Sequence, residues 1–360
     1  MACEIFGLVV SRRGRNDSAA MKAYQIHTYG GPEGLNLSDI PDIVPDHNGV
    51  IVQMRAASLN YRDLVVIAGQ YDRAPQPGRV PLSDGAGEVV AVGSAVRKFK
   101  VGDRVAGCFF QGWSSGRFAP GMHRTALGGA IDGVLAEQVQ FREEGLVHLP
   151  LNFSFEEGAT LPCAAVTAWQ ALIARGGLAP GETVLLLGTG GVSIFALQLA
   201  KAAGAKVIIT SSSDEKLQRA RKLGADEVIN YKADKDWGKT AARLSGTDGV
   251  DHVVEVGGAG TLAQSIRACR FGGKIELIGI LGGREVATEV FPIVTKGAAI
   301  FGIYVGSREM FENLNRALEQ TGIRPVIDRI FPFESVPEAY KYMESGSHFG
   351  KIVIRIGEQS

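Results

Sequence analysis

A glycine-rich turn is the segment of this sequence whose residue types most directly suggest chemistry. The run Gly188-Thr189-Gly190-Gly191-Val192-Ser193 follows the apolar stretch Val184–Leu187 and precedes a stretch rich in Ala and Leu. This order predicts a strand, a tight turn and a helix, the context in which such glycines bind a dinucleotide. Gly188 would allow the sharp turn, and Gly190 would let the pyrophosphate approach the backbone N–H groups at the helix start. Ser193 replaces the third glycine of the pattern, but serine is small enough for close helix–strand packing. A turn without a ligand is the alternative. The candidate cofactor contacts are Gly188, Gly190, Gly191 and Val192.

The residues after the next strand bear on the choice of cofactor. A site for NAD usually has Asp or Glu on the ribose diol, about 20 residues after the first glycine. Here the strand Val207–Ile209 runs into Thr210-Ser211-Ser212-Ser213, and Lys216 follows in the first turn of a helix. Hydroxyl groups and a cation suit a 2′-phosphate, so we expect NADP(H) rather than NAD(H), with Ser211, Ser212 and Lys216 as contacts. The serines could instead cap the helix, and the two interpretations are compatible.

The elements that must position these residues fall into two parts. From Met21 to about Leu149, short β runs are separated by glycine and turn signals, which is typical of a small β-rich domain. These runs are Val50–Ala57, Glu88–Val92, Asp103–Ala106, Leu135–Gln140 and Val147–Leu149.

After Pro150, apolar runs alternate with helical stretches, which predicts βαβ units on a parallel sheet buried on both faces. The runs after the glycine turn are Val207–Ile209, Val250–Val256, Lys274–Ile278 and Ala299–Ile303, and the helices include Val192–Ala203 and Glu215–Leu223. Two further helices, Arg308–Thr321 and Val336–Ser345, and a closing strand, Lys351–Ile356, complete the chain.

Composition narrows the class of protein. The 360 residues are 45% apolar and 21% charged, close to the averages for globular proteins, and 47 glycines indicate many tight turns. Lys and Arg together number 38, as do Asp and Glu, so a nucleic-acid partner is not expected. No apolar run is long enough for a membrane span. The four cysteines are far apart in sequence, which fits a reducing compartment, and we expect a cytoplasmic protein.

The first 20 residues differ from the rest. The apolar run Ile5–Val10 precedes Arg12, Arg13 and Arg15, the reverse of the order in a secretory signal. Glu4 and Asp17 also argue against a mitochondrial presequence. We expect residues 1–20 to be a disordered N-terminal extension.

Several motifs together resemble one enzyme superfamily. They are Gly87-Glu88-Val89-Val90-Ala91-Val92-Gly93, Lys100-Val101-Gly102-Asp103-Arg104-Val105, Ala164–Trp169, the Gly188–Ser193 turn and Leu223-Gly224-Ala225-Asp226. With them, the chain from Met21 onward resembles the medium-chain dehydrogenases/reductases, which include zinc alcohol dehydrogenases and quinone reductases. The resemblance implies a GroES-like catalytic domain (21–150), a Rossmann cofactor domain with a six-stranded, doubly wound parallel sheet (151–305) and a return to the catalytic domain (306–360). It also implies a homodimer or homotetramer joined through the cofactor domain, and it places Thr167 under the nicotinamide; a core threonine is the alternative.

The sequence departs from the zinc-binding pattern of that superfamily. Where zinc members have a Cys after the Val50–Ala57 strand, this chain has Asn60, and where they have His-Glu it has Ser83-Asp84. Cys163 stands at the third ligand position, but one ligand cannot hold zinc. The lobe for a structural zinc has Cys108 alone. We therefore expect no zinc, with Cys163 a buried small apolar residue and Asp84 more simply a loop cap than an acid–base group.

Without a metal, a hydrogen-bond donor must polarise the substrate oxygen, or the acceptor must be intrinsically reactive. Quinones and α,β-unsaturated carbonyls are reactive because charge delocalises over the conjugated system. Tyr71 resembles the tyrosine that metal-free enoyl reductases place near substrate, where a phenol can donate a proton. Asn60 would hydrogen-bond the nicotinamide ribose or the substrate. The alternatives are a tyrosine packed in a surface loop and an Asx-type turn, and His123 is expected to be exposed.

These observations lead to a hypothesis with two rivals. We expect a zinc-independent, NADP(H)-dependent oxidoreductase that transfers hydride to a small quinone or α,β-unsaturated carbonyl. The rivals are a zinc-free alcohol dehydrogenase or ketone reductase and a non-catalytic NADPH-binding protein.

Overall fold

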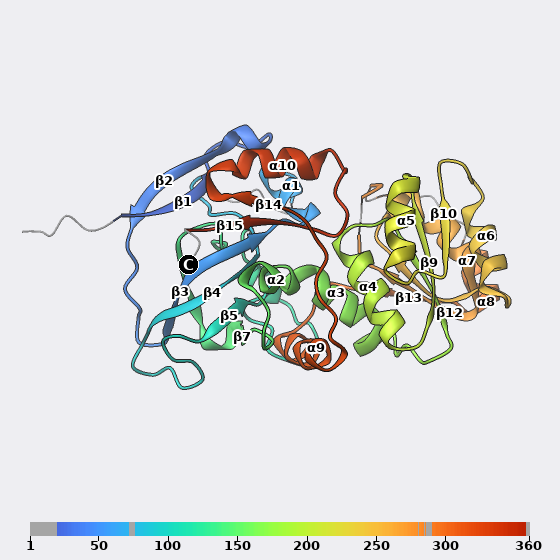
Figure 1. The fold of residues 1–360 in the computed structure, drawn as a ribbon, viewed down its shortest axis with the longest axis horizontal. Helices are drawn as coiled ribbons and strands as arrows, with labels where there is room; N and C mark the ends of the chain where they lie inside the picture. Colours follow the sequence, from blue (N-terminus) through green and yellow to red (C-terminus); the bar gives the residue numbers. More distant parts are fainter. Residues whose placement is uncertain (1–19, 72–75, 280, 284, 286–289, 358–360) are drawn as a thin grey trace, which may run out of the picture.

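The computed structural model describes residues 20–71, 76–279, 281–283, 285 and 290–357, and the structural statements below concern those residues. The chain forms two lobes side by side, each built on its own main β-sheet (Figure 1). Residues 1–19 of the expected N-terminal extension lie outside the described part. Ala20, the last residue of that expected extension, is already the first residue of a strand.

One lobe, called the catalytic lobe below, is built on a seven-stranded sheet in the order β14-β15-β3-β4-β5-β7, with β6 paired to β3. A separate antiparallel pair, β1 and β2, lies at its outer side (Figure 1). The strands are β1 (Ala20–Ile26), β2 (Leu35–Pro41), β3 (Gly49–Ser58), β4 (Asp84–Val92), β5 (Arg104–Gly107), β6 (Gln138–Arg142), β7 (Leu146–His148), β14 (Ile327–Pro332) and β15 (Lys351–Arg355).

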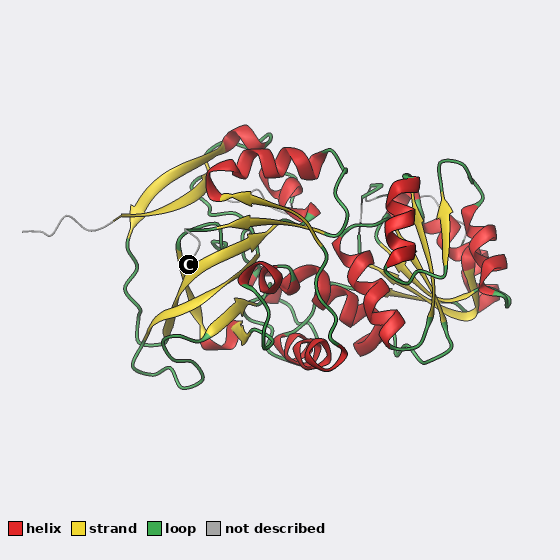
Figure 2. Cartoon of the chain, viewed as in Figure 1, coloured by secondary structure: helices red, strands yellow, loops and turns green. Residues whose placement is uncertain are grey.

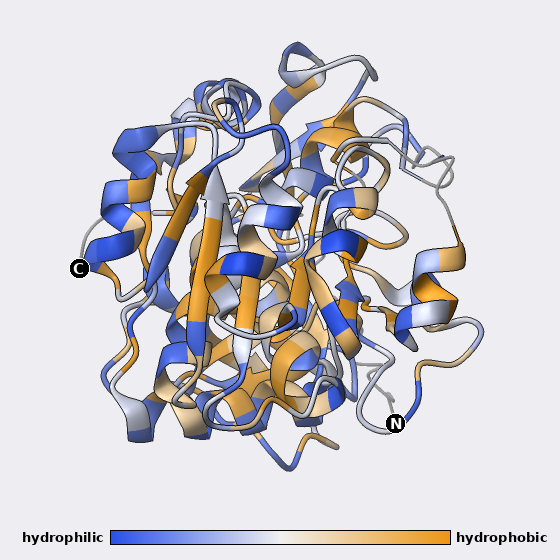
Figure 3. Cartoon of the chain, turned by 90° about the vertical axis from the view of Figure 1, so that its right-hand side faces the viewer, coloured by the Kyte–Doolittle hydropathy of each residue, from blue (hydrophilic) through white to orange (hydrophobic). Residues whose placement is uncertain are grey.

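The other lobe, the cofactor lobe, has a six-stranded parallel sheet in the order β10-β9-β8-β11-β12-β13. Its strands are β8 (Thr183–Leu187), β9 (Lys206–Ser211), β10 (Glu227–Asn230), β11 (Val250–Glu255), β12 (Cys269–Leu277) and β13 (Ala299–Gly302). Every residue of β8 is buried, as the continuous apolar run predicts for a strand covered on both faces. Viewed from this end of the molecule, the apolar strands lie among helices that carry hydrophilic residues (Figure 3).

Strand order reverses at β8, because β9 and β10 extend the sheet to one side and β11 to β13 extend it to the other. Ligands of such sheets bind outside the carboxyl ends of the strands at this switch point. The glycine turn that follows β8 is therefore where a doubly wound fold binds its ligand.

Helices connect the strands and pack between the lobes (Figure 2). They are α1 (Tyr61–Ile67), α2 (Phe155–Ala159), α3 (Val166–Trp169), α4 (Gly191–Ala202), α5 (Asp214–Lys222), α6 (Trp237–Ser245), α7 (Leu262–Ala268), α8 (Phe291–Lys296), α9 (Arg308–Thr321) and α10 (Val336–Glu344). No helix in the described ranges combines the length and apolar character needed to cross a bilayer.

The end of the chain returns to the catalytic lobe. β15 pairs antiparallel with β3, so that Val353 faces Ser58 and Ile354 faces Ala57, almost 300 residues apart in sequence. In Figure 1 the dark red end of the chain lies beside the blue strand β3. The seven-stranded sheet thus contains strands from both the N-terminal and the C-terminal parts of the described chain.

Most element boundaries agree with the sequence within one or two residues, and α9 agrees at both ends. The interpretation of Leu135–Gln140 as one strand is wrong, because the strand there is Gln138–Arg142. Leu135 N instead donates to Pro81 O, and Glu137 N donates to Lys22 O, so these residues bridge to two other segments before the strand begins.

Candidate cofactor and active site

The glycine turn after β8 has the geometry of a phosphate cradle. Gly188 has φ +72°, a conformation that favours glycine, and Gly190 is the N-cap of α4. A Cβ added at Gly188 or Gly190 would meet no atom within 4 Å, so the turn is open on its outer side. Ser193 is buried and donates to Leu187 O at 2.7 Å, which shows how serine fills the third glycine position. The turn therefore fits a pyrophosphate lying over Gly191 and Val192 at the start of α4.

The closing strand of the chain contacts this turn directly. Gly350 N donates to Thr189 O at 3.0 Å, and Gly350 forms a parallel bridge with Gly190. A Cβ on Gly191 would lie 2.6 Å from Cδ of Lys351, so glycine at this position makes room for the lysine stem. The C-terminal strand thus ties the cofactor turn to the catalytic lobe.

Lys351 extends from this contact to Asn60. Its ammonium donates to Asn60 Oδ1 and to Leu59 O, both at 2.6 Å. Lys351 is only 3% exposed and Asn60 9%, so both are buried. Asn60 is the N-cap of α1, and its backbone N donates to Asp63 Oδ2 at 2.8 Å. Because Lys351 engages the amide oxygen, the amide nitrogen Nδ2 is left facing Asp84, whose pKa it helps to lower, although no hydrogen bond of normal geometry joins the two groups among the described atoms.

Asp84 and Cys163 complete the cluster around this lysine. Asp84 is fully buried, and it accepts from Ser83 Oγ at 2.7 Å and from Cys163 N at 3.0 Å. The expectation that Asp84 caps a loop is wrong, because it is the first residue of β4 and its carboxylate joins two segments of the interior. Burial raises its pKa, and nearby Lys351 opposes that rise. Cys163 is partly rather than fully buried, and desolvation raises the pKa of its thiol.

This set of donors does not fit a zinc ion. Catalytic zinc needs three protein ligands, whereas the expected ligand positions hold the amide of Asn60, the hydroxyl of Ser83 beside the Asp84 carboxylate that it hydrogen-bonds, and the thiol of Cys163. The ammonium of Lys351, hydrogen-bonded to the amide, already supplies a cation to the cluster. Within the part of the chain that the structure describes, no group of three or more His, Cys, Asp or Glu side chains is arranged to hold a metal.

Tyr71 lies where the two lobes meet. Its hydroxyl is 2.7 Å from that of Tyr304, which follows β13 of the cofactor lobe. Tyr71 is therefore half-buried and joined to the other lobe, in contrast to the alternative of a tyrosine packed within a surface loop. Burial raises the pKa of Tyr304.

Arg62 holds the ring of Tyr71 from the other side. Its guanidinium carbon lies 4.7 Å from the centre of the Tyr71 ring and 4.8 Å from that of Phe109. Nε and Nη2 of Arg62 are buried without hydrogen-bond partners in the described ranges, and Nη1 is 3.5 Å from Asp63 Oδ1. Two aromatic faces and one distant carboxylate thus surround a buried cation.

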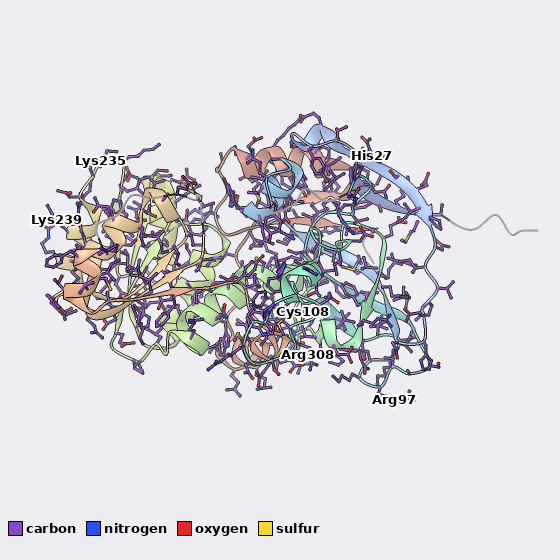
Figure 4. The ribbon with its side chains drawn as sticks, turned by 180° about the vertical axis from the view of Figure 1, so that it is seen from behind. His27, Arg97, Cys108, Lys235, Lys239 and Arg308 are labelled. Carbon is purple, nitrogen blue, oxygen red and sulfur yellow. The ribbon has the colours of Figure 1, made fainter. Side chains whose placement is uncertain are left out.

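A cluster of aromatic side chains packs beside Tyr304. Phe110 packs edge-on against Tyr304 with ring centres 4.8 Å apart, and Phe118 lies 5.5 Å from Tyr304. Cys108 and Arg308, labelled in Figure 4, lie near this region, where the lobes meet.

The remaining candidate cofactor residues lie on α3, at the end of β9 and on α5. Thr167 is buried on α3, between the π-helical segments Leu161–Ala165 and Gln170–Arg175. Ser211 ends β9 and is buried, Ser212 is half-buried, and the hydroxyl of Ser213 caps α5 by accepting from Lys216 N. Capping therefore uses the hydroxyl of Ser213, whereas Ser211 Oγ accepts from Ser213 N at 3.3 Å and Ser212 lies between them at the strand end. Lys216 Nζ donates to Gly346 O at 2.6 Å, and burial lowers its pKa.

Comparison with known proteins agrees with this geometry. Residues 46–151 match the family model described as an alcohol dehydrogenase GroES-like domain, and residues 191–320 match the one described as a zinc-binding dehydrogenase. The chain belongs to the medium-chain dehydrogenase/reductase superfamily. It is therefore an oxidoreductase with a nicotinamide cofactor.

Relatives of this medium-chain dehydrogenase/reductase have differing names. A zinc-type alcohol dehydrogenase-like protein of Schizosaccharomyces pombe is 45% identical over 313 residues, covering 85% of this chain and 90% of its own. A Mus musculus quinone oxidoreductase is 30% identical over 344 residues, covering 93% and 97%. The solved structure of a putative alcohol dehydrogenase from Sinorhizobium meliloti 1021 superimposes with a TM-score of 0.88 at 42% identity, covering 94% of this chain and 99% of that one. A structure called an NAD-dependent alcohol dehydrogenase has a TM-score of 0.85 at 35% identity, covering 94% and 100%.

In this member of the superfamily, three residues of the site were not found from sequence. They are Arg62, Tyr304 and Lys351. Lys351 carried one signal, because it is a lysine in an otherwise apolar closing strand and directly follows Gly350. Arg62 and Tyr304 carried none, since each resembles an ordinary surface residue until the lobes are assembled. His123 is exposed, as expected.

Proposed function

We propose that this chain is a zinc-independent, NADP(H)-dependent reductase of quinones or α,β-unsaturated carbonyls. The observation that carries the proposal is the cluster of Asn60, Asp84 and Cys163 around the buried ammonium of Lys351. With a cation of its own in that cluster and too few ligands for zinc, the chain has no evident use for a metal there.

The preference for NADP(H) rests on the end of β9. Positions 211 and 212 are serine rather than Asp or Glu, and Lys216 is within one helical turn of them. A carboxylate at this point would repel a 2′-phosphate, whereas hydroxyl groups and an ammonium attract it. The bound nicotinamide supplies or accepts the hydride.

Protein groups must then handle the oxygen and the proton of the acceptor. Tyr71 is the proposed donor, because its hydroxyl lies between the lobes and Arg62 and Tyr304 fix its ring and hydroxyl. Asn60 presents a buried N–H donor, held in one orientation by Lys351. A hydrogen bond from either group would stabilise an oxygen that becomes negative as hydride adds. An acceptor in which this negative charge spreads over a conjugated system needs no stabilisation beyond such a hydrogen bond.

The experiment is a steady-state screen of quinones, enones, enoyl thioesters and saturated ketones, each with NADPH and with NADH. The proposal predicts turnover of a conjugated acceptor with NADPH preferred, and slow or absent turnover of saturated ketones. Turnover of saturated ketones or alcohols alone would establish the ketone reductase instead. Tight NADPH binding without turnover of any class would favour the non-catalytic alternative.

We also propose a homo-oligomer, dimer or tetramer, that works in the cytoplasm on a small molecule. β13 is the edge strand of the parallel sheet, and Phe291 and Val294 of the adjacent helix α8 are 73% and 74% exposed. An apolar edge of this kind suits pairing with a second copy. The three described cysteines, Cys108, Cys163 and Cys269, are free thiols, which suits a reducing compartment. Light scattering of the purified protein, compared with Val294→Glu, tests the oligomer.

A further inference from the structure

His348 is a half-buried polar residue that the reaction outlined above does not use. It lies in the segment between α10 and β15, two residues before the Gly350 that bonds the cofactor turn. Its Nδ1 is buried and has no hydrogen-bond partner among the described residues. A buried nitrogen left unpaired costs free energy, so the absence of a partner at this position requires an explanation.

The charged groups around His348 are mostly positive. Lys216 of α5 reaches the same segment through its bond to Gly346 O, and Lys351 of β15 is close enough to lower the pKa of His348 as well. Asp328 of β14 is the carboxylate that faces His348, but it already accepts from Arg219 at 3.0 Å and from Tyr342 at 2.7 Å. The carboxylate that faces His348 is therefore already engaged by two other groups.

The cofactor turn is the third neighbour. Gly350 bridges Gly190, and the stem of Lys351 runs past Gly191, so the segment containing His348 lies against the turn expected to bind phosphate. Lys216, which donates to Gly346 O, is the residue expected to bind the 2′-phosphate. The segment that contains His348 thus contacts both a residue and a turn expected to bind the negative charges of a dinucleotide.

We propose that His348 binds a phosphate oxygen of the dinucleotide, and that it does so in its protonated form. The inference rests on the proposed NADP(H) function, and it adds a specificity residue contributed by the C-terminal segment rather than by the cofactor lobe. The imidazolium would form a charge-assisted hydrogen bond to phosphate and would give the orphaned Nδ1 its partner.

This proposal has a consequence for protons. In the free protein, burial and the two lysines lower the pKa of His348 to about 4, so the ring is neutral near pH 7. A bound phosphate reverses this balance, because a negative charge next to the ring favours its protonated form. Cofactor binding should therefore take up a proton, and NADPH should bind more tightly as pH falls toward 6.

The test is isothermal titration calorimetry of the full chain with NADPH and with NADH, in two buffers of different ionisation enthalpy, from pH 6 to 8.5. The wild-type protein should take up a fraction of a proton per NADPH near pH 6. The 2′-phosphate itself titrates near pH 6, so the same titration of His348→Gln gives the background to subtract. His348→Gln should weaken NADPH about tenfold at pH 6 and by less than about threefold at pH 8.5. His27→Gln is the control, because His27 is exposed in the catalytic lobe, away from the parallel sheet (Figure 4).

The NADH arm distinguishes the two phosphate sources. A His348-dependent uptake seen with both cofactors assigns His348 to the pyrophosphate, and one seen with NADPH alone assigns it to the 2′-phosphate. If NADPH is preferred but wild type and His348→Gln take up equal numbers of protons, the inference is wrong and the proposed function stands. If NADH binds as tightly as NADPH, the NADP(H) assignment is wrong. The proton uptake on NADH binding, compared between wild type and His348→Gln, then decides whether His348 binds a phosphate. Should His348→Gln fail to fold, His348→Asn replaces it, because the proton background of the 2′-phosphate can be subtracted only with a variant that lacks the imidazole.

Discussion

The ammonium of Lys351 and the amide of Asn60 are joined by a 2.6 Å hydrogen bond across 291 residues of sequence. It connects the strand that closes the chain to the start of α1, and it fixes which end of the Asn60 amide is the donor. Without Lys351 this bond would not orient the Asn60 amide, and without Asn60 the ammonium of Lys351 would lose one of its acceptors.

We expect the two residues to be energetically coupled. In a double-mutant cycle of Lys351→Met and Asn60→Ala, the free energies of unfolding should be non-additive by about 1.5–3 kcal/mol, the range for hydrogen bonds to charged groups. The measurement is urea unfolding at pH 7. Lys239→Met, at the far end of the cofactor lobe (Figure 4), should combine additively with Asn60→Ala. Additivity of both pairs would mean that the Lys351–Asn60 bond contributes nothing net.

Tyr71→Phe should lower kcat on the best acceptor by up to about a hundredfold, because removal of one oxyanion donor costs that order in well-studied enzymes. Tyr304→Phe breaks the same hydroxyl–hydroxyl bond but leaves the Tyr71 hydroxyl in place. It is the matched control and should cost much less. Equal losses in both variants would indicate that the bond between the lobes matters rather than the proton donor, and an undiminished kcat in Tyr71→Phe would remove Tyr71 from the reaction.

Lys216→Ala should weaken NADPH about 10- to 150-fold and leave NADH nearly unchanged, because NADH has no 2′-phosphate. Lys216 is partly exposed, so the effect should shrink in high salt. Fluorescence titration of both cofactors measures it. Equal losses for the two cofactors would assign Lys216 a structural role through Gly346, and the NADP(H) proposal would then depend on the missing carboxylate alone.

Asp63 should make stability depend on pH. Burial raises its pKa to about 6 from an ordinary value of 3.8. The folded protein therefore holds the Asp63 proton more tightly than the unfolded chain does. The contribution of this proton to the free energy of unfolding is complete below about pH 4 and is lost as the pH rises through 6. The loss is on the order of 3 kcal/mol, at 1.36 kcal/mol per pH unit. Asp63→Asn cannot titrate, so its stability relative to wild type should rise between pH 4 and 6.5 and then level off. A difference that is flat with pH would contradict the raised pKa.

Protein purified without added metal should contain far less than one zinc per chain by elemental analysis, and chelators should leave its activity unchanged. The reason is that Asn60, Asp84 and Cys163 do not supply three ligands, and Lys351 is hydrogen-bonded among them. Stoichiometric zinc together with inactivation by a chelator would overturn this expectation.

The local sequence was sufficient to predict most strands and helices and the glycine turn that is expected to bind the cofactor. The apolar run of β8, the positive φ required at Gly188 and the helix that follows are all encoded within about 15 consecutive residues, so spacing alone identifies them. The alternation of strands and helices also determines a parallel sheet, because each strand must be buried on both faces. Substitution of the zinc ligand positions was likewise visible as Asn60 and Ser83-Asp84.

Only the tertiary structure decided what replaces those ligands. Lys351 reaches Asn60 because β15 pairs with β3, and Tyr304 reaches Tyr71 because the two lobes meet. Arg62 becomes a buried cation only when Tyr71 and Phe109 enclose it. Most of these contacts join residues tens to hundreds of positions apart, where no periodicity or local propensity connects them. The desolvation that gives these groups their chemistry exists only once the chain has packed around them.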